Sequence, residues 1–313
     1  MTQFILRRLL ILPVVLLGVS VVVFMVLHLV PGNPAEVIAG PDAPPETVRQ
    51  IEVELGLDKP LPEQYALYMG RVLQGDLGRS LRSRRPVLAD VLDALPNTIE
   101  LTLVAAVITP LIAIPLGVVA AARRRSALDS GLMLVSMVGI TAPAFATSLG
   151  LMWLFGYQLR WFPISGDAGP LWTLDGLRSV FLPALALAIG AVAALARLTR
   201  SAMLDVLNQD YVRTARAKGL REQVVLLQHG LRNALLPVVT VIGLQVALLL
   251  SGAFVTETVF AWPGIGRLAV FAISSRDFPV VQGTVLVIAL LFVLINLVVD
   301  VMYAYVDPRI HYS

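Results

Sequence analysis

Six long runs of apolar residues, separated by shorter polar stretches, dominate the hydrophobic pattern of the chain. The first run, residues 9–30, is interrupted only by Gly18, Ser20 and His28. At about 1.5 Å per residue a helix of this length reaches roughly 33 Å, enough to cross a hydrocarbon core of about 30 Å. The pattern therefore predicts an all-α membrane protein with six transmembrane helices. The other five runs cover residues 99–122, 132–159, 181–197, 237–256 and 282–305.

Composition supports this class of protein. The 313 residues are 57% hydrophobic and 14% charged, whereas a soluble domain carries about 25% charged residues. The chain contains no cysteine, which excludes disulfides, thiolate zinc sites, iron–sulfur clusters and a cysteine nucleophile. The first run is longer than the apolar core of a signal peptide, about 7–15 residues, and the sequence PGNP follows it instead of a cleavage site. We therefore expect an uncleaved first helix.

The distribution of charge predicts the orientation of the helices. Six spans place both termini on one side, together with the turn 123–130 and the loop 197–236. These segments carry 13 Lys and Arg residues against 5 Asp and Glu, while the segments on the other side carry 11 against 14. Because cytoplasmic loops of membrane proteins are rich in Lys and Arg, both termini and the 197–236 loop are predicted to be cytoplasmic.

Residues 31–98 form the one sizeable segment outside the membrane in this topology. Nine prolines among its 68 residues exclude a single long helix. Instead, a helix is expected to begin at Pro45 and to end at Gly56, and a second helix follows it. We therefore predict a small helical segment on the outer face. The apolar positions at helical spacing are Val48, Ile51 and Leu55 in the first helix and Tyr65, Tyr68 and Val72 in the second.

The sequence contains no motif for catalysis or nucleotide binding. The histidines, His28, His229 and His311, do not pair with acids at metal-ligand spacing, and neither GxxxxGK[ST] nor GxSxG occurs. Uphill transport would draw its energy from a partner protein or an ion gradient. An ion-coupled carrier has ionisable residues deep in its spans, whereas Glu100, three residues after Asn97, is expected to cap the start of the second span. A carrier acting alone is therefore the less favoured alternative.

A basic segment, from Arg213 to Pro237, separates the fourth and fifth apolar runs. Its first part predicts a short helix from Asp210 to Lys218 that ends at Gly219, since glycine adopts the left-handed conformation of a helix stop. A second, amphipathic helix is expected to run along the membrane surface before Pro237 opens the fifth span. Its apolar positions are Val224, Leu227 and Leu231, with Val225 and Gln228 beside them.

The alternative for this basic segment is an anchor on anionic lipid, which requires only scattered Lys and Arg residues. An anchor does not require a glycine stop or small residues on the first helix. Ala215 and Ala217 make that helix slim enough to enter a cleft in another protein, and we favour this interpretation.

The wording of this segment resembles the cytoplasmic coupling loop of bacterial ABC importer permeases, in particular the dipeptide, oligopeptide, nickel and glutathione subfamily. The general permease signature has Glu-Ala-Ala, three residues and Gly, whereas this chain has Arg213, Thr214, Ala215 and Gly219 at those places. That departure, and a longer spacing from Gly219 to Pro237, are both similar to the peptide subfamily. The segments that carry the resemblance are DYVRTARAKGL (210–220), HGLRNALLPVVT (229–240), VIAGP (37–41), LGLDKPL (55–61), GDLGRS (75–80), RLTRSAMLDVL (197–207), FAWPGIGRL (260–268) and INLVVDVMYAYVDPRI (295–310).

The resemblance implies a type I ABC importer permease fold in the bacterial inner membrane. It implies a first domain, residues 1–98, with the first transmembrane helix and the external segment, and a second, residues 99–313, with a five-helix core and the coupling loop 198–236. The expected partners are a homologous second permease, two ABC ATPase subunits, an external substrate-binding protein and the lipid bilayer, but no nucleic acid. No cofactor is expected on this chain, since ATP and Mg belong to the partner ATPase. The residues expected to couple to the ATPase are Arg213, Thr214, Ala215, Arg216, Ala217, Lys218, Gly219, His229, Asn233 and Pro237.

Two further groups of residues are candidates for the transport path. The apolar loop at Trp262, Pro263, Gly264 and Gly266 is expected to dip into the pore mouth as an outer gate; a turn anchored at the interface by Trp262 is the alternative. Polar residues within the spans are candidates for the pore wall, and interhelical hydrogen bonding is the alternative for each. These residues are Thr147, Ser148, Gln245, Ser251 and Asn296.

The favoured function is therefore the membrane subunit of an ATP-driven importer for peptides or peptide-like solutes, such as dipeptides, oligopeptides or glutathione. The chain is expected to have no enzymatic centre of its own. The alternatives are a gradient-driven carrier or channel that works without an ATPase, and a membrane scaffold that docks soluble proteins.

Overall fold

The computed structural model describes residues 2–29, 34–39 and 43–306. Parts of the sequence-based expectations concern positions outside this range: the end of the 37–41 motif, the charges of the C-terminal tail, and His311. The side chain of His28 is also outside it.

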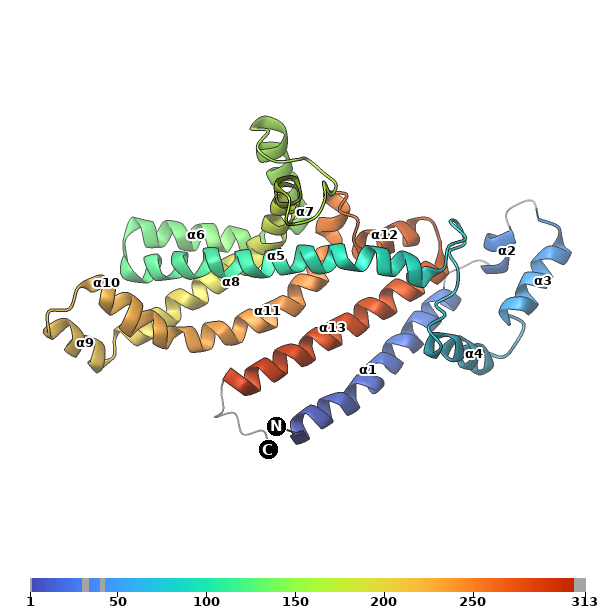
Figure 1. Ribbon diagram of the computed structural model, residues 1–313, viewed down its shortest axis with the longest axis horizontal. Helices are drawn as coiled ribbons and strands as arrows, with labels where there is room; N and C mark the ends of the chain where they lie inside the picture. Colours follow the sequence, from blue (N-terminus) through green and yellow to red (C-terminus); the bar gives the residue numbers. More distant parts are fainter. Residues whose placement is uncertain (1, 30–33, 40–42, 307–313) are drawn as a thin grey trace. The chain divides into compact units, whose positions relative to one another are not determined.

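The described chain is helical, and its only β pairing is an isolated antiparallel bridge between Arg79 and Pro86. Figure 1 labels the α-helices. The elements in chain order are α1 (Thr2–Leu29), α2 (Pro34–Ala39), α3 (Pro45–Leu55), α4 (Leu61–Leu73), α5 (Val87–Ala122), α6 (Ala127–Thr141), α7 (Ala144–Leu151), the π-helix η1 (Met152–Gln158), α8 (Leu174–Leu207), α9 (Asp210–Ala217), α10 (Glu222–Val224), the π-helix η2 (Val225–Leu231), α11 (Arg232–Val259), α12 (Ile265–Ser274) and α13 (Phe278–Val306).

Within the described residues, four helices are long and apolar enough to cross a membrane, or five if a bent pair counts as one span. The four are Val87–Ala122, Leu174–Leu207, Glu222–Val259 and Phe278–Val299. Residues Leu10–Met25 of α1 form a shorter apolar stretch. The chain is therefore an all-helical, multi-pass membrane protein.

The third apolar run is not one straight helix. α6 and the helix formed by α7 and η1 meet at an angle of 112°. Ala142, between them, is extended with φ −66° and ψ 130°, because the ring of the following Pro143 disfavours helical geometry in the residue before it. The expectation of a single span over residues 132–159 is thus replaced by a broken one.

The second span begins earlier than its apolar run indicates. α5 starts at Val87 and continues through Asn97 and Glu100 to Ala122, a length of 36 residues. The expectation that Glu100 caps a helix N-terminus is therefore wrong. The amphipathic first three turns of α5 contain Asp90 and Asp93 and lack a hydrophobic run, so the apolar pattern alone misses them.

The short helices before α5 follow their local signals. α3 begins at Pro45 and its stop, Gly56, has φ +71°, the left-handed conformation that glycine adopts without a steric penalty. α4 carries Tyr65 and Tyr68 on the face toward α1, where Tyr65 hydrogen-bonds Ser20 at 2.7 Å and packs edge-to-face on Phe24.

The helices form two compact units. The first consists mainly of Met1–Asn97 and Pro263–Leu297, and the second mainly of Thr98–Trp262. The core of the first unit contains Val87 and Val91 of α5 packed against α12 and α13. This division differs from the two domains expected from the sequence, since residues 263–297 group with the N-terminal part.

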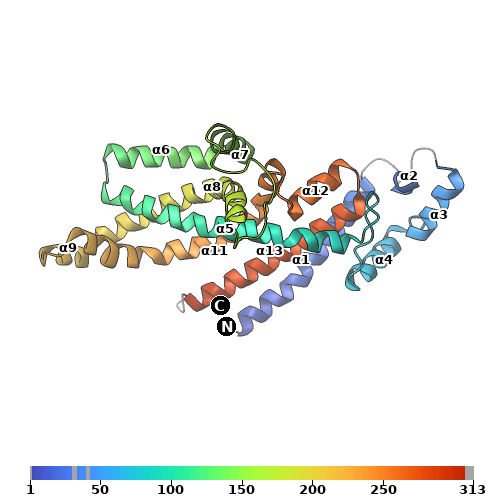
Figure 2. The same cartoon turned by 45° about the horizontal axis from the view of Figure 1, so that its top comes forward.

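α8 lies at the centre of the second unit and packs against both α6 and α11, as Figure 2 shows. At Gly117 of α5 the backbone comes so close to α8 that a Cβ atom would lie 2.5 Å from Cβ of Thr199. At the start of α6 the buried Asp129 accepts two hydrogen bonds from Arg200 of α8, at 2.6 and 2.7 Å. Close packing and this bidentate ion pair hold α5 and α6 against α8.

Candidate functional site

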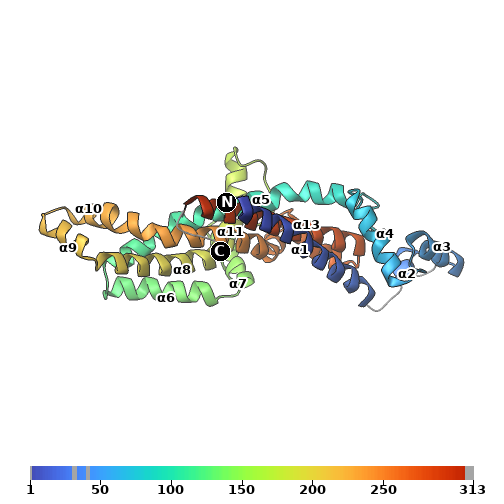
Figure 3. The same cartoon turned by 90° about the horizontal axis from the view of Figure 1, so that it is seen from below.

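The helix–turn–helix expected in the basic segment is present. α9 covers Asp210–Ala217, and Gly219 follows with φ +75°. No atom lies within 4 Å of the place where a Cβ at Gly219 would stand, so the backbone conformation, and not crowding, requires glycine here. In Figure 3, α9 lies at the tip of the second unit, between the end of α8 and α10.

One face of α9 packs inside the chain. Val212 is fully buried and Ala215 is 5% exposed, and both contact the buried Val225 of η2 in a cluster that also includes Val206 and Leu207. Ala215, expected to face a partner protein, therefore contributes to the chain's own core. The alanine left on the outside is Ala217.

The other face of α9 is solvent-exposed and basic. Arg213 makes only a long ion pair with Asp210, at 3.5 Å, and its side chain is 73% exposed. Thr214, Ala217 and Lys218 are exposed beside it. This face thus presents two cations and small side chains.

Arg216 has a different position from the other cations. It binds both carboxylate oxygens of Glu222 across the turn, at 2.8 and 3.3 Å. The hydrogen bond that Arg216 donates to Glu222 raises the pKa of its guanidinium. Because this pair joins the end of α9 to the start of α10, Arg216 stabilises the turn, and it is less available to a partner than the sequence-based expectation assumed.

The second helix of the segment differs from its expected form. Glu222–Val259 is one helix of 38 residues, and Pro237 lies inside it, in the second turn of α11. The expectation of a separate surface helix that ends before Pro237 is therefore wrong. The i→i+5 bonding of η2 changes the helical period, so Val225 and Gly230 are buried while Leu227, expected on the apolar face, is 55% exposed.

A polar contact ties α9 to this long helix. The side-chain amide of Asn233 donates to the Tyr211 hydroxyl at 3.2 Å and to the His229 carbonyl at 2.9 Å. Gly230 allows η2 to approach α8, since a Cβ there would lie 3.0 Å from Met203. α9 is thus attached rigidly to the long helix Glu222–Val259, whose later turns lie in the apolar core of the second unit.

The expected gate residues are mostly internal. Trp262 is fully buried in the core of the second unit, among Leu101, Val180 and Leu249. In this arrangement its indole is neither exposed at an interface nor part of an opening. In the first unit, Gly264 and Gly266 are buried at the start of α12, while Pro263 is exposed.

Sequence reasoning missed a buried acid next to this loop. Glu257, in the last turn of α11, is fully buried and accepts a hydrogen bond from the Thr98 hydroxyl at 2.6 Å. Its carbonyl accepts from the backbone N–H of Trp262 at 2.8 Å. Because Glu257 directly follows the apolar run 237–256, the sequence pattern assigned it to a loop outside the membrane.

The candidate pore residues divide into two groups. Gln245 and Thr147 line a cavity of about 310 Å³ in the second unit, and Gln245 also donates to the Ala191 carbonyl at 3.2 Å. The hydroxyl or amide group of each of the other three donates to a carbonyl of its own helix, and not to another helix as the alternative interpretation had expected. These are Ser148 to Ala144, Ser251 to Ala247 and Asn296 to Phe292.

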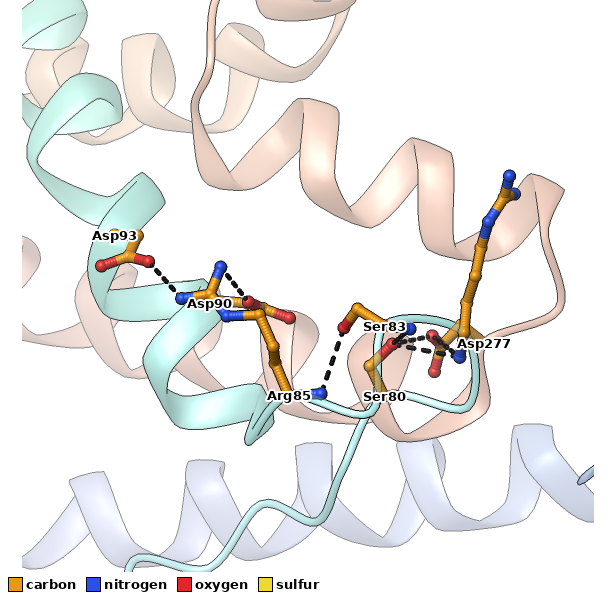
Figure 4. Close-up of polar contacts among 7 residues, drawn as sticks. Ser80, Ser83, Arg85, Asp90, Asp93 and Asp277 are labelled. Carbon is orange, nitrogen blue, oxygen red and sulfur yellow. Dashed lines mark hydrogen bonds and ion pairs between the residues drawn. The ribbon is translucent and has the colours of Figure 1, made fainter.

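A third polar site, absent from the sequence analysis, lies in the first unit (Figure 4). The buried carboxylate of Asp277 accepts hydrogen bonds from the Ser80 hydroxyl at 2.6 Å and from the backbone N–H groups of Leu81 and Arg82 at 3.1 and 3.4 Å. Ser80 in turn accepts from the N–H of Ser83 at 2.9 Å. These bonds fix the loop before α5 in one conformation.

The fixed loop is strongly basic. Arg85 binds Asp93 and Asp90 of α5, at 2.8 and 3.1 Å, and the hydrogen bond to Asp93 is the main cause that raises the pKa of Arg85. The remaining arginines of the loop have exposed side chains, and one of them stacks on Phe271. They are Arg79, Arg82 and Arg84.

These features define a multi-pass helical membrane protein with a rigidly mounted basic helix at the end of a long span. Residues 113–312 match the family described as "Binding-protein-dependent transport system inner membrane component", and residues 1–102 match its N-terminal family. The chain therefore belongs to this family of transport permeases. It is a transport subunit of the ABC importer type and not an enzyme, as expected from the sequence.

Relatives of known function support the same class over the whole chain. The dipeptide transport system permease protein DppB of Alkalihalophilus pseudofirmus is 43% identical over 100% of both chains. The glutathione transport system permease protein GsiC of Salmonella typhi is 45% identical, and the di/tripeptide transport system permease protein DppB of Pseudomonas aeruginosa is 44% identical, again over 100% of both chains.

Proposed function

We propose that this chain is the permease subunit of an ATP-driven importer for peptides or peptide-like solutes of the dipeptide, oligopeptide or glutathione class. It works beside a homologous second permease, two ATPase subunits that bind ATP and Mg, and an external substrate-binding protein. The names of the relatives support the solute class, and the family description supports dependence on a binding protein.

The rigid mounting of α9 carries this proposal. A helix that transmits the closure of an ATPase must move as one body with the membrane helices, because a loose attachment would absorb the movement. Three contacts provide this rigidity: the buried Val212–Val225 packing, the Arg216–Glu222 pair and the Asn233–Tyr211 hydrogen bond. The unbroken helix Glu222–Val259 then carries the movement through the second unit.

The exposed face of α9 is the surface that fits an ATPase groove. Arg213 and Lys218 are free to pair with acidic residues there, and each such pair contributes about 0.5–3 kcal/mol depending on burial. Ala217 lies between them on the same exposed surface and lets the helix backbone approach closely. This placement requires the α9 end of the protein to be cytoplasmic.

The topology that fits this role has six spans with both termini in the cytoplasm. α1 supplies the first span, the bent α6–α7 pair the third, and α5, α8, Glu222–Val259 and α13 the others. The excess of Lys and Arg on the α9 side supports this orientation. The segment α2–α4 and the loop fixed by Asp277 then lie on the outer face.

The basic loop of Arg79, Arg82 and Arg84 is the surface we assign to the external binding protein. Its cations are held by a fixed backbone, and a fixed backbone favours a protein surface with acids at matching positions, whereas lipid headgroups require only accumulated charge. A gradient-driven carrier remains the alternative function. It would take up solute without any ATPase, and family membership argues against it.

The test is a tryptophan in the exposed face of α9. Ala217→Trp leaves the inner face intact, and we expect it to reduce ATP-dependent uptake by about tenfold or more, since overpacking a docked surface costs ~1–3 kcal/mol. Ala66→Trp is the matched control, because Ala66 is also an exposed alanine on a short helix. Uptake and binding-protein-stimulated ATP hydrolysis are measured in proteoliposomes that contain the assembled importer.

Equal activity of Ala217→Trp and Ala66→Trp would refute the coupling role of α9. Uptake by the wild type that persists without ATP, driven by an imposed ion gradient, would instead favour the carrier. Ala215→Trp is unsuitable as a test, because Ala215 is buried against Val225 and its replacement would disturb the chain's own packing.

A further inference from the structure

The cavity of about 310 Å³ in the second unit lies among α6, α7, α8 and α11. Its size falls at the lower end of the range for small-molecule sites, about 300–1,000 Å³. The bend at Ala142 opens it, because α7 leaves the direction of α6 there. Small residues from all four helices and from the break between α6 and α7 line it: Gly139, Ala142, Ala144, Gly190, Ala194 and Gly252.

Two polar atoms in the wall of this cavity have unused hydrogen-bonding capacity. Among the described residues, four buried side-chain oxygens have no hydrogen-bond partner, and two of the four, Gln245 Oε1 and Thr256 Oγ1, belong to the cavity wall. Gln245 is 8% exposed and Thr256 is 1% exposed. Since buried polar groups are nearly always hydrogen-bonded, this pair calls for a partner that the isolated chain does not supply.

Other hydroxyls of α11 show that the situation of Thr256 is specific. Thr240, Ser251 and Thr258 each donate to the carbonyl four residues earlier in the helix, at 3.1, 3.4 and 2.8 Å. Thr256 makes no such bond.

The amide of Gln245 is oriented by one of its own contacts. Its Nε2 donates to the Ala191 carbonyl of α8 at 3.2 Å. With the nitrogen held there, Oε1 is a fixed acceptor in the cavity wall, and it needs an N–H or O–H donor.

We propose that this cavity is a solute subsite of the transport path, where Gln245 Oε1 accepts a hydrogen bond from a peptide N–H and Thr256 provides a second polar contact. This inference rests on the proposed function and specifies how the permease itself recognises its solute. Gln245 and Thr256 are 11 positions apart, which corresponds to about 16 Å along α11. An extended peptide covers about 3.3–3.6 Å per residue, so a dipeptide meets the two groups one after the other.

A helix of the second permease is the competing occupant. The backbone N–H groups within a helix are already bonded to its own carbonyls, so such a helix would satisfy Gln245 only through a side chain. A peptide has free backbone N–H groups and suits the acceptor directly.

The test compares two solutes in the assembled importer, reconstituted in proteoliposomes with its binding protein. The probes are L-alanyl-L-alanine and the analogue methylated at the peptide nitrogen, which lacks the peptide N–H donor. The affinity of the binding protein for each is measured separately and divided out. Gln245→Met keeps the side-chain volume and removes the acceptor, Thr256→Val is the isosteric second variant, and Thr240→Val is the control.

The wild type is expected to transport the parent dipeptide about threefold to tenfold more efficiently than the methylated analogue, the range of one net hydrogen bond. Gln245→Met should reduce kcat/KM for the parent to the value of the analogue and leave the analogue unchanged. Thr256→Val should lower kcat/KM for both probes, and Thr240→Val should change neither.

A Gln245→Met variant that transports both probes like the wild type would overturn the proposal. Equal slowing of both probes, or loss of the second permease from the purified complex, would assign the amide to packing or to the permease contact and would also overturn it. Failure of the proposed function has a different signature, since the wild type would then take up neither probe with ATP, whatever residue stands at 245.

Discussion

The hydrogen bonds of Asp277 make a quantitative prediction about the loop before α5. Asp277→Asn preserves the size of the side chain, removes its charge, and replaces one acceptor oxygen by an NH2 group that cannot accept. The three donors are the Ser80 hydroxyl and the N–H groups of Leu81 and Arg82. At least one of them loses its acceptor in a site where Asp277 is only 4% exposed.

The cost follows from the difference between charged and neutral hydrogen bonds. A bond to a charged group contributes about 1.5–3 kcal/mol and a neutral one about 0.5–1.5 kcal/mol. Losing one charged bond alone therefore destabilises the closed loop by about 1.5–3 kcal/mol, and weakening the other two adds to this. The loss of the one bond corresponds to a roughly 10-fold to 150-fold larger population of the open loop.

Limited proteolysis measures this population. The loop contains trypsin sites after Arg82 and Arg84, and cleavage of a transiently opened segment follows its open fraction when opening is fast. We expect cleavage of purified Asp277→Asn in nanodiscs to accelerate by a similar factor, with the fragments identified by mass spectrometry.

The matched control is Asp76→Asn, since exposed Asp76 accepts one bond, from the N–H of Gly78 at 2.9 Å. We expect this variant to change cleavage by less than about threefold. The same rate for Asp277→Asn and the wild type, or the same acceleration in both variants, would refute the reasoning.

Two further predictions concern packing and docking. Gly117→Ala should lower the apparent unfolding temperature in detergent by several degrees, because its Cβ would lie 2.5 Å from Thr199 and overpacking costs about 1–3 kcal/mol. Gly190→Ala is the control and should cause no such decrease, since the atom nearest to its Cβ would lie at 3.7 Å. Equal shifts of the two variants in thermal denaturation would contradict the close approach of α5 and α8. Arg84→Glu should weaken stimulation of ATP hydrolysis by the binding protein about fivefold at low salt and little at high salt. The control Arg49→Glu, on α3, should have no effect. If the effect of Arg84→Glu in ATPase titrations does not depend on the salt concentration, the loop is not part of the docking surface.

Much of the local structure follows from short-range signals in the sequence. The helix between Pro45 and Gly56 and the turn at Gly219 were predicted at their observed positions, because proline and glycine restrict the backbone through their own covalent geometry. The same rule, applied to Ala142 before Pro143, would have predicted the break in the third span. The apolar runs located the membrane helices, but the amphipathic beginnings of α5 and of the long helix from Glu222 lack a continuous apolar run.

The sites depend on contacts between distant parts of the chain. Ser80 and Asp277 are 197 residues apart, and Gln245 meets the Ala191 carbonyl 54 residues away. Ala215 shares one face of α9 with Val212, three residues earlier, but only the packing of that face against Val225 of η2 shows that it is covered by the chain itself and not by a partner.

The sequence by itself determined the class of protein, the positions of most helices and the glycine turn of the basic segment, since each depends on composition or on neighbours within a few residues. Only the tertiary structure decided which face of α9 is free, that Trp262 and Glu257 are internal, and that Gln245 and Thr256 border a cavity with unused hydrogen-bonding capacity. Burial and hydrogen-bond satisfaction are properties of side chains brought together from separate helices, and a pattern along one helix does not contain them.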